Sequence, residues 1–88
     1  MEQVIADAAR RTGVPFERIE VIRAEAVQWQ DSSLGCPEPN TEYLQVIVDG
    51  YWVVVAAGGK ELDYRLDDRG NLHLCDQPSP QPPYSGDR

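Results

Sequence analysis

The fold of this chain is decided by residues 43–75, which read YLQVIVDGYWVVVAAGGKELDYRLDDRGNLHLC. Apolar residues recur along this stretch, and three short segments interrupt them: Asp-Gly at 49–50, Gly-Gly at 58–59 and Asp-Arg-Gly at 68–70. Such segments are typical of β-hairpin turns, because glycine adopts positive φ without a steric penalty. The stretch therefore predicts a four-stranded antiparallel meander.

The same pattern predicts which residues face one another across the strands. A turn at 49–50 would place Val46 opposite Val53, and a turn at 58–59 would place Val53 opposite Tyr64. At 68–70 a two-residue loop would put His73 among the apolar residues, whereas a three-residue loop brings Leu74 opposite Tyr64, so we favour the longer loop. One face then collects the apolar side chains of Leu44, Val46, Val48, Tyr51, Val53, Val55, Leu62, Tyr64 and Leu66, joined by Leu72 and Leu74.

The opposite face of the predicted sheet is mixed in character. It has two cross-strand rows, the first of Ile47, Trp52, Arg65 and His73 and the second of Gln45, Val54, Asp63 and Cys75. The neighbours Trp52 and Arg65 could form a cation–π contact, worth about 0.5–1 kcal/mol at an exposed site. Tyr43, Ile47 and Trp52 are apolar enough to need a cover. Either the segment 29–39 folds over them as a lid, which we favour, or a partner covers them.

The segments before residue 43 complete the predicted fold. Residues 2–15 predict a short amphipathic helix that covers the apolar face, with Gly13 as its C-cap. Residues 19–29 favour a strand at one edge of the sheet, with a helix as the alternative, and residues 30–42 form a loop. The prediction is an α+β domain over residues 1–75, in which an N-terminal helix packs on an antiparallel β-sheet meander of four to five strands with one disulfide. Residues 76–88 contain four prolines and predict a disordered tail or linker.

The composition excludes several classes of partner. The chain has 88 residues, with 15 Asp and Glu against 8 Lys and Arg, and its formal net charge is −7. Since no basic stripe is present, we expect no nucleic-acid partner and no anionic membrane surface. No apolar run approaches the roughly 18 residues of a membrane span, so we expect no membrane insertion. The start of the chain is polar, and we expect no export signal within it.

Cys36 and Cys75 leave four interpretations open. A structural disulfide, which we favour, would fasten the loop 30–42 to the last strand and contribute about 2–4 kcal/mol to stability. Two inert free thiols are the second interpretation, and a thiol enzyme with Cys36 as nucleophile and His73 as base is the third. The fourth is a metal site of Cys36, His73 and Cys75, which lacks a fourth ligand. We expect no catalytic residue, no metal site and no cofactor.

The segment VQWQDSSLGCPEP at residues 27–39, followed by the stretch 43–75, resembles a small domain of exported bacterial proteins of unknown function. The pattern of that family runs W-x-D-x-S-L-G-C-P-x-P-G, and Trp29, Asp31 and residues 33–37 match it most specifically. Asn40 stands where the family has glycine. The resemblance covers residues 3–75 and implies an extracytoplasmic setting with an oxidised cysteine pair. It implies no activity.

From these observations we expect a non-enzymatic extracytoplasmic module that binds a protein or peptide. The candidate contact surface consists of Tyr43, Trp52, Arg65 and His73 on the sheet, with Ser33, Leu34 and Glu38 of the loop beside them. A second possible function is a protease inhibitor that presents residues 32–38, similar in outline to potato-type serine protease inhibitors. A thiol-dependent enzyme that uses Cys36 and His73 is the third, and a purely structural spacer is the fourth.

Overall fold

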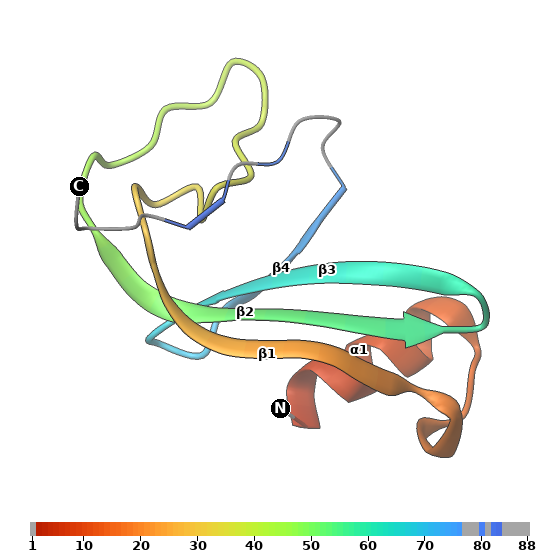
Figure 1. The fold of residues 1–88 in the computed structure, drawn as a ribbon. Coiled ribbons are helices and arrows are strands. Elements are labelled where there is room, and N and C mark those ends of the chain that lie inside the picture. The colour runs from red at the N-terminus through yellow and green to blue at the C-terminus, as the bar shows by residue number, and fades with distance from the viewer. Residues whose placement is uncertain (1, 77–79, 81, 84–88) are drawn as a thin grey trace.

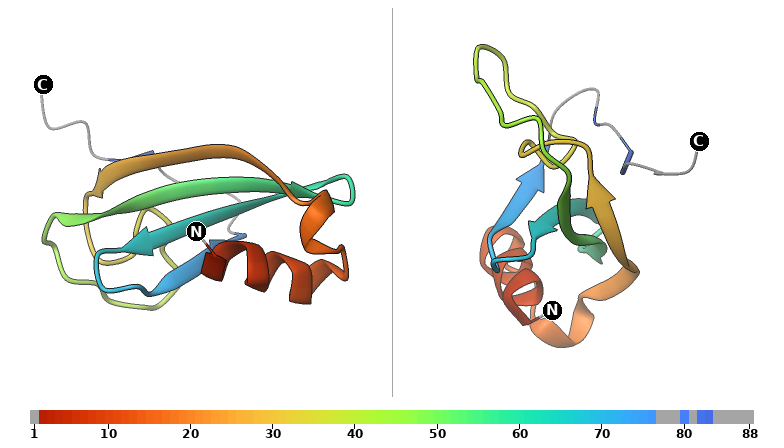
Figure 2. Two further views of the ribbon diagram at one scale, coloured as in Figure 1. Left: turned by 90° about the horizontal axis from the view of Figure 1, so that it is seen from below. Right: turned by 90° about the vertical axis from the view of Figure 1, so that its left-hand side faces the viewer.

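The structure is a computed structural model that describes residues 2–76, 80 and 82–83. Its elements are α1 (Glu2–Thr12), a 3-10 turn η1 (Phe16–Arg18), β1 (Glu20–Trp29), β2 (Val48–Ala57), β3 (Lys60–Asp67) and β4 (Leu72–Cys75). The strands form one antiparallel sheet in the order β1-β2-β3-β4 (Figure 1). The helix lies on one face of this curved sheet (Figure 2). The predicted fold class is confirmed, with four strands in the described part of the chain.

The helix-covered face carries the main hydrophobic core. Val4 and Ala8 of α1 are fully buried, because these positions recur on one side of the helix and meet the apolar face of the sheet. The core residues contributed by the sheet are Val53, Val55, Tyr64 and Leu66, with Leu62, Leu72 and Leu74 packed at their margin.

Within the described residues, no helix is long and apolar enough to cross a membrane.

A buried polar contact fixes α1 on this core. The Tyr64 hydroxyl donates to Asp7 Oδ2 at 2.6 Å, and Arg10 and Arg11 each pair with Asp7 at 2.5 Å. Burial alone would raise the pKa of Asp7, but the hydrogen bonds from Tyr64 and Arg11 outweigh it, so the pKa lies below the usual value of 3.8. Burial and the neighbouring carboxylate raise the pKa of Tyr64. Asp7 therefore stays charged and Tyr64 stays protonated.

Two of the three predicted turns are confirmed. Gly58 and Gly59 have φ values of 60° and 83°, and they place Val53 opposite Tyr64 as expected. Gly70 has a φ of 88°, and the three-residue loop before β4 places Leu74 opposite Tyr64. The rows Trp52–Arg65–His73 and Val54–Asp63–Cys75 are also present across the last three strands.

The predicted hairpin at residues 49–50 is wrong. β2 runs through Gly50 without a turn and pairs with β1, so that Trp29 lies opposite Val48. Gly50 is needed for a different reason: a Cβ there would lie 1.9 Å from the Leu66 carbonyl oxygen. Glycine stands at position 50 because the backbone of β3 comes close to β2 there. The sequence alone does not distinguish this cause from a turn.

This change of pairing moves several residues from their predicted places. Residues 43–47 form no strand, so Leu44 and Val46 leave the apolar face and are 70% and 52% exposed. Because β2 continues through position 50, Val48 lies on the face of Trp52. Arg23 and Glu25 of β1 take the cross-strand positions predicted for Gln45 and Ile47.

Candidate functional site

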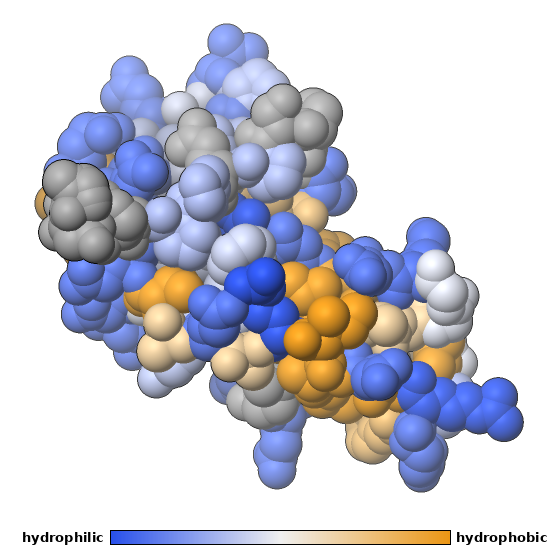
Figure 3. All heavy atoms as spheres, viewed as in Figure 1, coloured by the Kyte–Doolittle hydropathy of each residue, from blue (hydrophilic) through white to orange (hydrophobic). Residues whose placement is uncertain are grey.

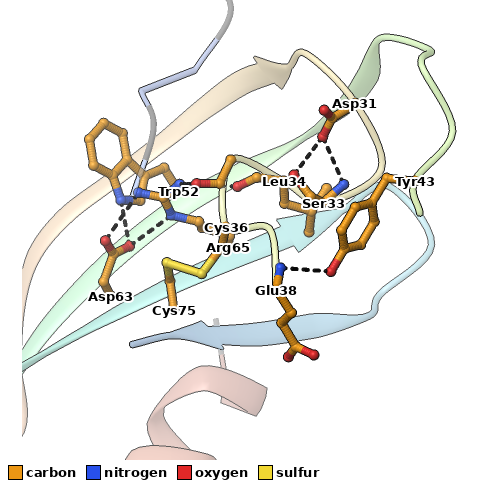
Figure 4. Close-up of a disulfide and its surroundings, with 11 residues drawn as sticks. Asp31, Ser33, Leu34, Cys36, Glu38, Tyr43, Trp52, Asp63, Arg65 and Cys75 are labelled. Carbon is orange, nitrogen blue, oxygen red and sulfur yellow. Dashed lines mark hydrogen bonds and ion pairs between the residues drawn. A yellow bond between two sulfur atoms is a disulfide. The ribbon is translucent and has the colours of Figure 1, made fainter. Parts of the chain in front are cut away.

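A disulfide between Cys36 and Cys75 fastens the loop 30–42, which we call the lid, to the face of the sheet opposite α1 (Figure 4). The two Cα atoms are 5.8 Å apart, and the cysteines are 39 positions apart in the chain. The predicted disulfide is confirmed. Cys36 therefore presents no free thiol as a nucleophile.

The inner half of the lid, residues 33–36, is buried against the sheet. Asp31 Oδ1 accepts hydrogen bonds from the Ser33 backbone N–H at 2.9 Å and from the Ser33 hydroxyl at 2.5 Å. Leu34 and Gly35 then adopt successive positive φ values of 58° and 73°. This tight course turns the backbone carbonyls of Leu34 and Gly35 toward the sheet, and Cys36 follows at the position of the disulfide.

Arg65 joins the lid to β3. Its side chain is buried, with the whole residue only 1% exposed, and Nη1 donates to the carbonyl oxygens of Leu34 at 3.1 Å and Gly35 at 2.9 Å. Its Nε and Nη2 each lie 3.2 Å from a carboxylate oxygen of Asp63 (Figure 4). A buried guanidinium is stabilised only when its charge and its donors have partners, and this arrangement supplies both.

Aromatic rings enclose the same guanidinium. The Arg65 carbon Cζ lies 4.9 Å from the Trp29 ring centroid and 5.3 Å from that of Trp52, so the predicted Trp52–Arg65 contact is present. Arg23 lies on Trp52 at 4.4 Å. The two rings meet edge to face, at 6.2 Å between centroids. The sequence did not predict that Trp29 and Arg23 join this cluster, because their positions depend on the pairing of β1 with β2.

The candidate contact residues divide into three groups by accessibility. Ser33, Leu34 and Arg65 are buried, so their proposed role on an accessible surface is corrected: they hold the lid in place. Trp52, His73 and Tyr43 are partly buried, and Glu38 is exposed. His73 lies opposite Arg65 across the sheet. Among the described residues, no group of three or more His, Cys, Asp or Glu side chains could hold a metal ion.

The segment at residues 37–47, which includes the end of the lid and the residues before β2, projects away from the sheet (Figure 1). Figure 3 shows the hydropathy of the same side of the molecule. Leu44, Val46 and Ile47, which we call the apolar ridge, are 70%, 52% and 48% exposed. The Ser32 N–H donates to the Leu44 carbonyl at 3.0 Å, and the Leu44 N–H donates back to the Ser32 hydroxyl at 2.9 Å. The side chains of the ridge are thus exposed, while the Leu44 backbone is hydrogen-bonded to Ser32 of the lid.

A hollow of about 310 Å³ separates the apolar ridge from the turn between β3 and β4. Leu34 and Val48 contribute apolar surface to it, and Asp49, Asp67 and Asp68 lie at its edge with Arg69. Burial would raise the pKa of Asp67, but hydrogen bonds from Asn71 and the Arg69 backbone lower it below the usual value. The hollow therefore combines apolar walls with an ionised carboxylate.

In the comparison with protein families, residues 1–75 match a family described as a domain of unknown function, DUF8738. The chain belongs to this family. Neither the curated proteins nor the solved structures contain a match. The match agrees with the expectation of a domain of unknown function and assigns no activity. The predicted tail over residues 76–88 lies mostly outside the described residues.

Proposed function

We propose that this domain is a non-enzymatic extracytoplasmic module that binds a protein or peptide through the apolar ridge. The observation that supports the proposal is the exposure of Leu44, Val46 and Ile47 on a loop fastened by a disulfide and by Arg65. Removing apolar surface from water contributes about 25 cal/mol of favourable free energy per Å². A loop that is already ordered loses less conformational entropy when it binds, so more of this free energy contributes to affinity.

The redox chemistry of the lid supports the proposed extracytoplasmic setting. Structural disulfides persist in oxidising compartments, whereas glutathione and thioredoxin keep most cytosolic cysteines reduced. The Cys36–Cys75 bond is consistent with an oxidising compartment. A reducing compartment would remove the covalent attachment on which the position of the ridge depends.

The lid geometry disfavours both the inhibitor and the thiol enzyme. A protease inhibitor must project its bait segment into an active site, but residues 33–36 of the 32–38 segment are buried. The carbonyls of Leu34 and Gly35, which a protease would have to reach, accept hydrogen bonds from Arg65. A thiol enzyme needs the Cys36 thiolate, and Cys36 is bonded to Cys75.

A displayed library of random peptides, selected on the immobilised oxidised domain, tests the proposal. Leu44→Ser and Ile47→Ser should each abolish retention of the selected peptides. Phe16→Ser is the matched control, because Phe16 is 62% exposed but lies outside the ridge. If no peptide is enriched, or if the selected peptides are retained equally by all three variants, the proposal is wrong.

A further inference from the structure

A second hollow lies on the other face of the sheet, between α1 and β1. Its volume is about 490 Å³, within the range of roughly 300–1,000 Å³ that is typical of ligand sites. Val4, Val53 and Leu66 supply buried apolar surface, and Ala24 and Ala26 of β1 lie along one side. In the end-on view of Figure 2, α1 lies below the β3–β4 side of the sheet and leaves β1 uncovered. We call this hollow the α1–β1 groove.

Tyr51 shows that the groove is unfilled at the level of β2. It stands on the core face opposite Leu66 and Ala26, where the pattern of the sequence predicts burial. It is nevertheless 51% exposed, because the helix covers Val53 and Val55 but not this end of the strand. An occupant of the groove would cover the Tyr51 ring, which the fold itself leaves half exposed to solvent.

The edge of β1 favours an extended occupant. The strand order places β1 at the edge of the sheet, and residues 20–26 are exposed along its length. An edge strand offers backbone donors and acceptors to an added strand, and alternate side chains of that strand can enter a groove beside it. The β-bulge between Val21 and Arg23 disrupts the start of β1, so the part that is both regular and exposed runs from Arg23 to Ala26.

Negative charge at one end of the groove indicates which charge the occupant should carry. Asp67, Asp68 and Gly70 close the groove at the turn between β3 and β4, and the same two aspartates border the hollow beside the apolar ridge. Asp67 accepts hydrogen bonds within the turn, while Asp68 is exposed. With a formal net charge of −7 on the chain, this corner attracts a cation and repels an anion.

We infer that the α1–β1 groove takes an extended peptide segment that places an apolar side chain against Tyr51 and Ala26 and a Lys or Arg side chain beside Asp68. This inference goes beyond the proposed function, because it adds a second site and names the chemistry of the segment that occupies it. Because Asp67 and Asp68 border both hollows, a single partner can follow the groove, pass the turn and reach the apolar ridge.

Three labelled synthetic peptides test the charge preference: alternating valine and lysine, valine and glutamine, and valine and glutamate. Their dissociation constants for the oxidised domain are measured by fluorescence anisotropy at low and at moderate salt. The lysine peptide should bind most tightly and weaken as salt rises, because screening acts over about 10 Å at 0.1 M. Equal affinity of the glutamine peptide, or a dimer of the domain that excludes all three, would overturn the inference.

Two variants and one control variant locate the binding. Asp68→Asn should weaken the lysine peptide about twofold to fivefold, the usual size for one exposed charge pair. Glu61→Gln removes the same charge from an exposed position of β3 away from the groove and should have little effect. Ala26→Trp fills the groove from an exposed position and should abolish binding, with circular dichroism confirming the fold.

The outcomes separate this inference from the proposed function. If Ile47→Ser abolishes binding of the lysine peptide while Ala26→Trp and Asp68→Asn leave its dissociation constant unchanged, the groove inference is wrong and the ridge proposal stands. If Ala26→Trp abolishes binding while Ile47→Ser and Leu44→Ser do not change it, the groove is the site and the ridge proposal is wrong.

Discussion

The two faces of the sheet are covered by different chemistry. On one face, α1 buries Val4 and Ala8 against a continuous apolar surface, and the contact is dominated by the hydrophobic effect. On the other face, the lid is held by a disulfide, a buried guanidinium and two tryptophan rings. A cover without a regular apolar pattern needs specific bonds at each point. The loss of one bond therefore affects the lid more than the loss of one methyl group affects the helix.

The largest expected effect is the loss of the disulfide. The variant Cys36→Ser with Cys75→Ser should lose about 2–4 kcal/mol of unfolding free energy, measured by urea denaturation. Intact mass after alkylation under denaturing conditions provides the control, since only the reduced wild-type protein should gain two alkyl groups. Labelling without reduction would show that the lid is not covalently fastened and would contradict this account.

Removal of the guanidinium comes next. Arg65→Met keeps much of the side-chain volume but leaves the carbonyls of Leu34 and Gly35 without their donor, so we expect a loss of about 2–3 kcal/mol. Tryptophan fluorescence should also change, because Trp29 and Trp52 lose the cation between them. Arg65→Lys keeps the charge but not the planar fork and should recover only part of the stability. A fully stable Arg65→Met would mean that the disulfide alone positions the lid.

The polar contact on the helix face has a smaller effect that depends on pH. The folded pKa of Asp7 lies below its unfolded value near 3.8, so its contribution is present above that pH and is lost as pH falls through the folded pKa. Asp7→Asn should cost about 1.5–2 kcal/mol at pH 7 and less at pH 3. Urea denaturation at both values checks this, and an equal cost at both would show that the charge of Asp7 does not matter.

The smallest expected effect lies on the apolar ridge. Leu44→Ser and Val46→Ser should change the unfolding free energy by less than about 0.5 kcal/mol, because both side chains are already exposed. Thermal denaturation compares them with Val55→Ala in the helix-covered core, which should cost several times more. A large loss in the ridge variants would mean that these side chains support the lid, and that their exposure reflects no binding role.

The candidate site was predictable only in part, for reasons visible in particular residues. Cys75, Trp52 and Arg65 were placed on one face because strand alternation brings them there. The burial of Arg65 was not predictable, because it depends on the course of the lid across the sheet. Leu34 illustrates this: its side chain has no periodic neighbours, and the lid buries it while the nearby Leu44 is left in solvent.

The sequence by itself determined the helix, the last three strands and their register, because turn chemistry and the two-residue period of a strand are local properties. It favoured a disulfide between the two cysteines but left other interpretations open, and the tertiary structure decided between them, because the bond joins residues 39 positions apart. Only the tertiary structure decided that β1, rather than residues 43–47, lies beside β2. An apolar segment before Asp-Gly is compatible with both arrangements, and the choice depends on long-range contacts: the approach of Leu66 to Gly50 and the contacts of Trp29 with Arg65 and Trp52. Those contacts exist only after the chain has folded, and they leave the apolar ridge exposed.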